Sequence, residues 1–282
     1  MWRDLFAKKR EPSAELSSAL ADLDRLGRDR PELASPAIAL ARVLAATFGA
    51  PPRLARPYEF CVESPHFDDV ERAWGSGGAA FAEYPPSFDP DDLLARSSAI
   101  LKALKAENPA AALLLRAKID WGDLALSVAW NNEAEIERFA LDELVSVELL
   151  LSVARLTVLP VLAACSAEMA PHLPVTRAST ARCPNCSRPP SLAESRGLEG
   201  QRILRCGVCA AGWPGPRLAC AACGEASSLF LRSLFVEGEE SRHRVVACDS
   251  CGFRLKVVST LGPLSAPALI VADLATVHLD FV

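Results

Sequence analysis

Eight of the ten cysteines in this chain of 282 residues form four pairs, and two residues separate the cysteines of every pair. This gap lets a tight turn direct two thiolates at one ion, and two such turns complete a tetrahedral site of four sulfurs. Structural disulfides are rare in a reducing cytoplasm, so metal binding or redox catalysis is the main reason to keep this many cysteines. The spacing therefore predicts two metal centres, with the ligands Cys183, Cys186, Cys206, Cys209, Cys220, Cys223, Cys248 and Cys251.

The order in which the pairs combine is constrained by the lengths between them. Pairing in chain order leaves 19 residues between Cys186 and Cys206 and 24 residues between Cys223 and Cys248, and each length suits one hairpin. A crossed arrangement would require the strands of two lobes to interleave, against the preference for short, uncrossed connections. We therefore expect sequential pairing, although spacing alone also permits the crossed one.

A site made of thiolates alone selects zinc or iron. Zinc is the default ion, and iron would use the same four sulfurs, as it does in rubredoxin. Trp213 lies four residues after Cys209 and would give the first site an aromatic neighbour of the kind found in rubredoxin-like turns. The expected cofactors are two metal ions, zinc or iron, each held by four cysteines.

The composition changes along the chain, and the change defines the expected domains. Leu and Ala recur at helical spacing up to about residue 169, whereas short β-branched runs lie among the paired cysteines. The expected fold class is α+β, with an N-terminal all-α helical domain over residues 1–176. Two small tandem lobes of the rubredoxin-like or zinc-ribbon kind would follow, over residues 177–218 and 219–282, and the second would end in a C-terminal helix.

Local signals mark several helices of the first domain. Ser13 is placed to cap one helix, and Asp89 with Pro90 is a clear start for another because a proline at the first helical position loses no hydrogen bond. A later apolar run predicts a helix that Pro160 interrupts or kinks. Its inner face would be formed by Leu141, Leu144, Val147, Leu151, Ala154 and Val158.

The charge balance argues against nucleic acid as a partner. The chain has 30 basic and 35 acidic residues, and nucleic-acid binders usually carry a strong basic excess. Residues 177–282 hold 12 basic and 9 acidic side chains, and two four-thiolate zinc sites would bring this part close to neutral. A zinc-ribbon nucleic-acid-binding protein is therefore the weaker alternative. Six basic side chains could form a patch but are expected at solvated strand edges: Arg202, Arg205, Arg217, Arg242, His243 and Arg244.

Cytoplasmic localisation without membrane insertion is expected. The N-terminal segment has basic residues but no apolar stretch behind them, which argues against a secretory signal. The apolar segment from Leu144 to Cys165 contains Glu148, Arg155 and Pro160, whereas a membrane span needs ~20 nearly uncharged residues. This segment is expected to be a buried helix.

The remaining candidate groups do not suggest an enzyme. Cys61 and Cys165 stand alone in apolar context and are expected to be packed core thiols. The four histidines show no ligand spacing, and no nucleophile with a base is evident. A thiol redox protein is the other alternative, but its reactive thiolate would need a helix N-terminus, and the pairs here lie between expected hairpin strands.

With its eight cysteines in place, the chain resembles the formate dehydrogenase accessory protein family, FdhE. The resemblance rests on the order CPNC, CGVCAAGW, CAACG and CDSCGFRLK, on the hairpin SSLFLRSLFVEGEE, and on VADLATVHLD near the C-terminal end. The leucine-rich start around Pro31-Glu32-Leu33 is similar to the helical N-terminal region of that family. The resemblance spans nearly the whole chain, and its specific part covers residues 182–280.

The resemblance implies a function in binding rather than in turnover. Members of the family are cytoplasmic assembly factors that bind the catalytic subunit of a respiratory formate dehydrogenase before export, and iron has been implicated in their two rubredoxin-like sites. Carried over, this implies a maturation factor for a molybdenum- or tungsten-dependent formate dehydrogenase, with Cys183, Cys186, Cys206 and Cys209 as the first site and Cys220, Cys223, Cys248 and Cys251 as the second. Ser187 departs from the glycine that often follows the first pair in the family. The resemblance leaves the oligomeric state open.

Overall fold

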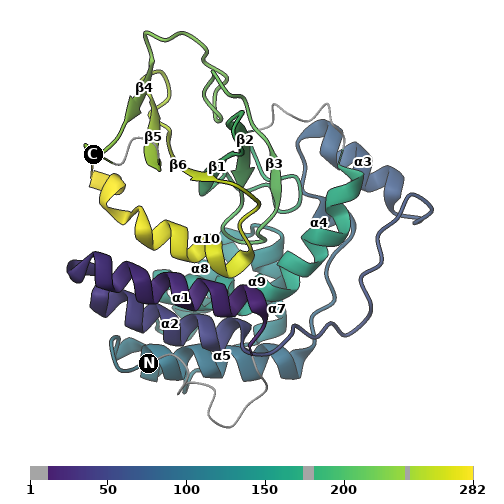
Figure 1. Ribbon diagram of the computed structural model, residues 1–282. Coiled ribbons are helices and arrows are strands. Elements are labelled where there is room, and N and C mark those ends of the chain that lie inside the picture. The colour runs from purple at the N-terminus through teal and green to yellow at the C-terminus, as the bar shows by residue number, and fades with distance from the viewer. Residues whose placement is uncertain (1–11, 174–180, 239–241, 282) are drawn as a thin grey trace. The chain divides into compact units, whose positions relative to one another are not determined.

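The computed structural model describes residues 12–173, 181–238 and 242–281 (Figure 1). Contacts divide the chain into two compact units, one made of helices and one built around a sheet. We call these the helical unit and the sheet unit. The helical unit is formed by residues 12–59, 85–165 and 266–271, and the sheet unit by residues 60–84, 166–265 and 272–281.

The α+β fold class with two ribbon-like lobes is confirmed by the elements of these units. The domain boundary expected after residue 176 and the start of the chain lie outside the described residues. The boundary expected after residue 218 stays a prediction.

Three helices that pack together begin the helical unit (Figure 1). α1 (Ala14–Asp29) begins where the sequence predicts, because the hydroxyl oxygen of Ser13 accepts a hydrogen bond from the amide of Leu16 at 3.2 Å. A short 3-10 turn, η2 (Pro31–Leu33), leads into α2 (Ala34–Phe48), which packs on α1. Leu16, Leu20 and Leu23 form the buried face of α1.

α5 (Pro90–Leu104) packs against α2 and also begins at its predicted cap. The carboxylate of Asp89 accepts a hydrogen bond from the amide of Asp92 at 3.0 Å. One turn later, the buried guanidinium of Arg96 bonds both carboxylate oxygens of Asp92 and also donates to the carbonyl of Thr47. This pair therefore holds α5 to the last turn of α2.

The prediction of a single helix that carries both Leu141 and Leu144 is wrong, because one helix ends and another begins near these residues. α8 (Glu133–Asp142) ends in a tight turn in which Leu144 has a φ of 54° and is 89% exposed. The amide of Val145 donates to the carbonyl of Ala140 at 2.9 Å, which closes a C-cap of the kind usually made with glycine. α6 (Ala110–Leu114) and α7 (Trp121–Ala129) precede this turn.

α9 (Val147–Met169) follows the turn and runs through Pro160 without ending, so the predicted interruption is not seen. Together with the 3-10 turn η3 (Ala170–His172), it is long and apolar enough to cross a membrane by length and composition. Of its most apolar 18-residue window, 67% is buried within the protein. A mostly buried helix is typical of a core, as the sequence predicts.

The strands of both predicted lobes belong to one mixed sheet with the order β3-β2-β1-β6-β5-β4 (Figure 1). β1 pairs in parallel with β6, with Leu192 opposite Lys256, and the other neighbours are antiparallel. This parallel pairing joins the two lobes and was not expected from the sequence. The strands are β1 (Leu192–Arg196), β2 (Gln201–Arg205), β3 (Gly212–Pro214), β4 (Leu231–Leu234), β5 (His243–Cys248) and β6 (Arg254–Thr260).

The expected C-terminal helix is present but shorter than the apolar run. α10 (Ala266–Ala275) is followed by the 3-10 turn η5 (Val277–Phe281). Leu279 packs with Val245 and Ala247 of β5 on one face of the sheet. Leu279 of η5 therefore covers part of that face.

Residues 60–84 belong to the sheet unit and carry α3 (Phe67–Ser76) and α4 (Ala80–Glu83). The ring of Phe60 lies 5.8 Å from that of Trp74 and 5.5 Å from that of His172. Cys61, next to this aromatic cluster, is exposed, so its prediction as a core thiol is wrong, whereas Cys165 is fully buried.

Candidate metal centres

The first group of four cysteines is fully buried and is built by the turns that flank β1 and β2. The sulfur of Cys183 lies 3.4 Å from that of Cys209, and the sulfur of Cys186 lies 3.4 Å from that of Cys206 and 3.9 Å from that of Cys209. All four thiols are free of disulfides. The first two pairs of the sequence thus form one group.

The second group is built by the turn before β4 and the turn between β5 and β6, and it is only half buried. The sulfur of Cys220 lies 3.7 Å from that of Cys251, and the sulfur of Cys223 lies 3.7 Å from that of Cys248. Cys223 and Cys251 are exposed, whereas Cys220 and Cys248 are buried. The four pairs combine in chain order, as expected, and not in the crossed arrangement.

The sulfur positions fit a metal ion. Within each group the four ligand atoms lie within 4.8 Å of one another. A tetrahedron with metal–sulfur bonds of about 2.3 Å has edges of about 3.8 Å, close to the observed separations. A disulfide would require about 2.05 Å. Each group could therefore hold one ion through four thiolates, a donor set that suits zinc and iron equally.

All four cysteine turns share one hydrogen-bond pattern. The amide of the residue after the second cysteine donates to the carbonyl of the first cysteine, and the amide of the first cysteine donates to the carbonyl two residues after the second. The first bond joins Ser187 to Cys183 at 2.9 Å, Ala210 to Cys206 at 3.0 Å, Gly224 to Cys220 at 3.1 Å and Gly252 to Cys248 at 2.8 Å. The second joins Cys183 to Arg188 at 2.7 Å, Cys206 to Ala211 at 3.0 Å, Cys220 to Glu225 at 2.7 Å and Cys248 to Phe253 at 2.9 Å.

This pattern requires a left-handed residue after each pair. Gly224 and Gly252 have φ of 78° and 73°, which glycine adopts without a Cβ penalty. Ser187 and Ala210 adopt the same region, with φ of 58° and 55°. The turns of the first group therefore keep the geometry of the second at a cost in backbone strain.

A neighbouring segment supports the first turn. The amides of Ala80 and Phe81, at the start of α4, donate to the carbonyls of Pro184 and Asn185 at 3.0 and 2.9 Å. The side-chain amide of Asn185 donates to the hydroxyl of Ser166 at 2.9 Å. These bonds give hydrogen-bond partners to the two buried backbone carbonyls between Cys183 and Cys186, and they fix the position of the turn.

The electrostatics of the first group favour a cation. Burial is the largest cause that raises the pKa of the Cys183 and Cys209 thiols well above the ordinary value. Hydrogen bonds from Cys183, Cys186 and Cys209 hold the pKa of Cys206 well below it. Cys206 therefore gives up its proton more readily than Cys183 and Cys209, and a bound divalent ion would favour the thiolate form of its ligands.

A buried carboxylate in β1 ties the first group to β6. Glu194 is 0% exposed and accepts hydrogen bonds from the guanidinium of Arg205 and from the hydroxyl of Thr260 at 3.1 Å. Arg205 also donates to the carbonyls of Ala210 and Leu264, both at 2.9 Å. The prediction of solvated arginines at strand edges is therefore wrong for Arg205. The one sequence signal for this network is a lone acidic residue in the middle of a short strand.

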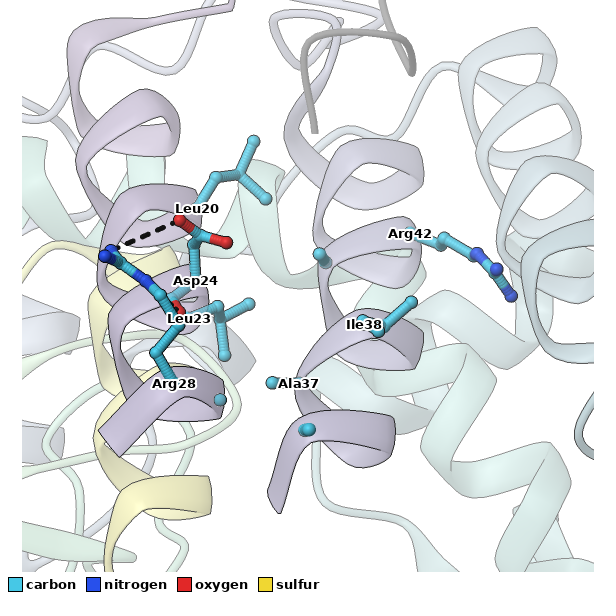
Figure 2. A pocket seen from close by; sticks show the side chains of 10 residues that line it. Leu20, Leu23, Asp24, Arg28, Ala37, Ile38 and Arg42 are labelled. Atoms are coloured by element: carbon cyan, nitrogen blue, oxygen red, sulfur yellow. Dashed lines mark hydrogen bonds and ion pairs between the residues drawn. The ribbon is translucent and has the colours of Figure 1, made fainter. Parts of the chain in front are cut away.

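A separate hollow of about 280 Å³ lies in the helical unit between α1 and α2 (Figure 2). Leu20, Leu23 and Ile38 line it, and Asp24 and Arg28 form an ion pair of 3.3 Å at its rim. In the described part of the chain, three or more potential metal ligands come together in the two cysteine groups. No such cluster of described residues lines this hollow.

Comparisons with known proteins agree with the resemblance seen in the sequence. No family model matches the chain. The protein FdhE homolog of Aquifex aeolicus is 31% identical over 102 residues, which are 35% of this chain and 35% of that protein. Protein FdhE of Escherichia coli O127:H6 is 31% identical over 100 residues, which are 35% of this chain and 31% of that protein. The sequence matches thus span about a third of the length of these curated relatives.

The fold matches over nearly the whole chain. The crystal structure of the FdhE protein from Pseudomonas aeruginosa superposes with a TM-score of 0.60 at 21% identity, covering 96% of this chain and 92% of that one. This chain is therefore similar to two FdhE proteins over part of its sequence and shares the fold of a third.

Proposed function

We propose that this protein is a cytoplasmic accessory factor that binds the catalytic subunit of a molybdenum- or tungsten-dependent formate dehydrogenase and assists its maturation before export. The observation that carries the proposal is the pair of four-cysteine groups in a fold shared with an FdhE crystal structure. The local sequence similarity to two FdhE proteins supports it.

The eight cysteines act as ligands of two metal ions in this proposal. A four-thiolate site is coordinatively closed, so its ion stabilises the protein and leaves no open position for a substrate. The activity is then binding of a protein client rather than turnover. Zinc and iron both remain candidates, because the donor set suits either.

A co-purification experiment tests this function. The full chain and the catalytic subunit of formate dehydrogenase from the same organism are expressed together without oxygen, and the tagged chain is recovered with its metal content measured. The wild-type chain is expected to carry two metal ions and to retain the catalytic subunit. The double variant Cys206→Ser, Cys209→Ser should lose both the first ion and the client.

The variant Cys61→Ser is the matched control, because Cys61 is exposed and outside both groups. It should retain the metal ions and the client. Failure of the metal-loaded wild-type chain to retain the catalytic subunit would contradict the proposed function.

A further inference from the structure

One face of the sheet carries a cavity of about 460 Å³ that both lobes line. The strand register places several of its lining residues on the same face. Ser195 of β1 lies opposite Arg202 of β2 and, on its other side, opposite Ser259 of β6, while Arg244 of β5 lies opposite Val257 of β6. Because alternate residues of a strand share a face, these positions face one way. Leu279 packs on Val245 and Ala247, which point to the other face.

Three arginines give this cavity a concentrated positive charge. Arg202, Arg217 and Arg244 line it, and we call it the arginine pocket. Among the described residues no carboxylate lines the pocket or lies within 4.0 Å of these three guanidinium groups. A fourth arginine, Arg232, is paired with Asp249 at 2.6 Å and is therefore already compensated. The pocket thus has about three positive charges with no acidic partner in the described part of the chain.

Arg202 is the buried member of this group. It is 8% exposed and donates to the carbonyl oxygens of Pro216 at 2.9 Å and Ala219 at 3.5 Å. Burial lowers the pKa of Arg202, and the like charges of Arg244 and Arg217 lower it further. The negative charge of the Cys220 thiolate has the opposite effect, but it is smaller. The sequence prediction of a solvated strand edge is therefore wrong for Arg202 as well.

The remaining lining suits a phosphate group. Ser195, Ser228 and Ser233 supply hydroxyl donors. Gly200 has a φ of 62°, and a Cβ there would lie 3.3 Å from the hydroxyl of Ser195 and 3.9 Å from a terminal nitrogen of Arg217. The turn therefore brings Arg217 and a hydroxyl to the same end of the cavity. Guanidinium forks match the oxygen spacing of phosphates and bind them with charge-assisted hydrogen bonds.

Size and charge narrow the class of ligand. The cavity falls within the range of about 300–1,000 Å³ that holds small molecules. Several uncompensated guanidinium groups suit a ligand with two or more negative charges better than a single carboxylate. Leu218, Leu231 and Val246 would contact the rest of such a molecule.

We propose that the arginine pocket binds a small molecule through a diphosphate or polyphosphate group. This inference does not rest on the proposed function. The rival explanation is that the arginines compensate the negative charge of the second four-thiolate centre, and this explanation requires neither an open cavity nor the three serine hydroxyls.

Titration calorimetry on the full, metal-loaded chain tests the proposal, with inorganic pyrophosphate and ADP as probes and acetate as the monoanion control. Both phosphates should bind with a stoichiometry of about one and raise the melting temperature, and acetate should do neither. Binding by pyrophosphate alone would identify inorganic polyphosphate as the source, whereas tighter binding of ADP would identify a nucleotide.

Variants connect the binding to the named residues. Arg217→Gln and Arg244→Gln should each weaken pyrophosphate binding at least about tenfold, the factor expected for one charge-assisted hydrogen bond. Arg244→Lys should give a smaller loss because the charge remains. Arg254→Gln is the matched control, since Arg254 is an exposed arginine of the same sheet outside the pocket.

Three results would overturn the proposal. The first is no binding of either phosphate to the metal-loaded wild-type chain. The second is unchanged binding in the double variant Arg217→Gln, Arg244→Gln. The third is tighter binding of a single-stranded oligonucleotide than of either phosphate, which would make the arginines part of a nucleic-acid surface. Loss of metal from the double variant, with no phosphate binding by the wild type, would assign the arginines to charge compensation.

Discussion

The guanidinium of Arg205 bonds the buried carboxylate of Glu194 and, through its other terminal nitrogen, the carbonyl of Ala210 at 2.9 Å. Ala210 directly follows Cys209, so this arginine joins a buried charge in β1 to the backbone of a cysteine turn. The same nitrogen bonds Leu264 beyond β6, and Thr260 of β6 bonds Glu194. The first cysteine group is therefore held by a side-chain network that extends across the sheet.

Glu194→Gln should destabilise the sheet unit by about 3 kcal/mol, because removing one partner leaves the other charge buried and uncompensated. The measurement is urea unfolding of the metal-loaded chain, followed by release of metal to a chromophoric chelator. Asp69→Asn removes the exposed Asp69–Arg72 pair of the same unit and should have a much smaller effect. Equal effects of the two variants would show that the network around Glu194 contributes no more than a surface pair.

Removal of the metal should unfold the sheet unit and leave most of the helices. A structural zinc contributes ~10–16 kcal/mol in small finger peptides, whereas α1, α2 and α5 are held by leucine packing and the Arg96–Asp92 pair. Circular dichroism during titration with a chelator should show loss of strand signal with retained helical signal. An intact strand signal after complete loss of metal would contradict this expectation.

Alkylation should reach the second cysteine group before the first. Cys223 and Cys251 are exposed, whereas all four cysteines of the first group are buried. Metal-bound thiolates resist alkylation until the ion leaves, so the exposed group should lose its ion and react first as chelator is added. Peptide mass spectrometry after timed iodoacetamide pulses measures the order. Cys61 provides the rate of an exposed thiol without metal, and simultaneous labelling of both groups would contradict the prediction.

Gly224→Ala should destabilise the metal-loaded sheet unit by about 1 kcal/mol, because alanine is strained at the φ of 78° found there. Gly262→Ala is a matched control, since a Cβ at either glycine would meet no atom within 4 Å and Gly262 is not in the left-handed region. Thermal unfolding of the two variants isolates the effect of backbone conformation. A Gly262→Ala variant as unstable as Gly224→Ala would remove that explanation.

Ala210→Gly should act in the opposite direction. Ala210 has a φ of 55° and occupies the place that Gly224 takes in the second group, so glycine relieves strain there. The midpoint for release of the first metal ion is expected to rise. A lower midpoint would indicate that the flexibility glycine adds to the unfolded chain outweighs the relieved strain.

Local features of the fold could be predicted from the sequence. The spacing of the cysteines predicts their grouping, and Ser13 and Asp89 predict helix starts, because each signal depends on residues that are neighbours in the chain. The turn at Leu144 escaped prediction since its left-handed residue is not a glycine. Local propensity is informative only where the residue type matches the conformation it adopts.

Long-range features could not be predicted in this way. The parallel pairing of β1 with β6 joins residues far apart in the sequence, and no local pattern encodes it. Glu194 is buried where it accepts a hydrogen bond from Thr260 of β6, so its environment depends on that pairing. Arg202 and Arg205 are also buried, although the sequence predicts solvated strand edges for both. The sequence thus predicts the two cysteine groups but not the buried charged residues of the same sheet.

The pairing of β1 with β6 has a consequence for synthesis on the ribosome. The nascent chain completes β1 and both of its cysteine turns well before β6 emerges, so the first ribbon has an open hydrogen-bonding edge during that interval. The edge closes only after the cysteines of the second ribbon have also been made. Because β6 is the last strand to be made, the two ribbons can join into one sheet only at the end of synthesis.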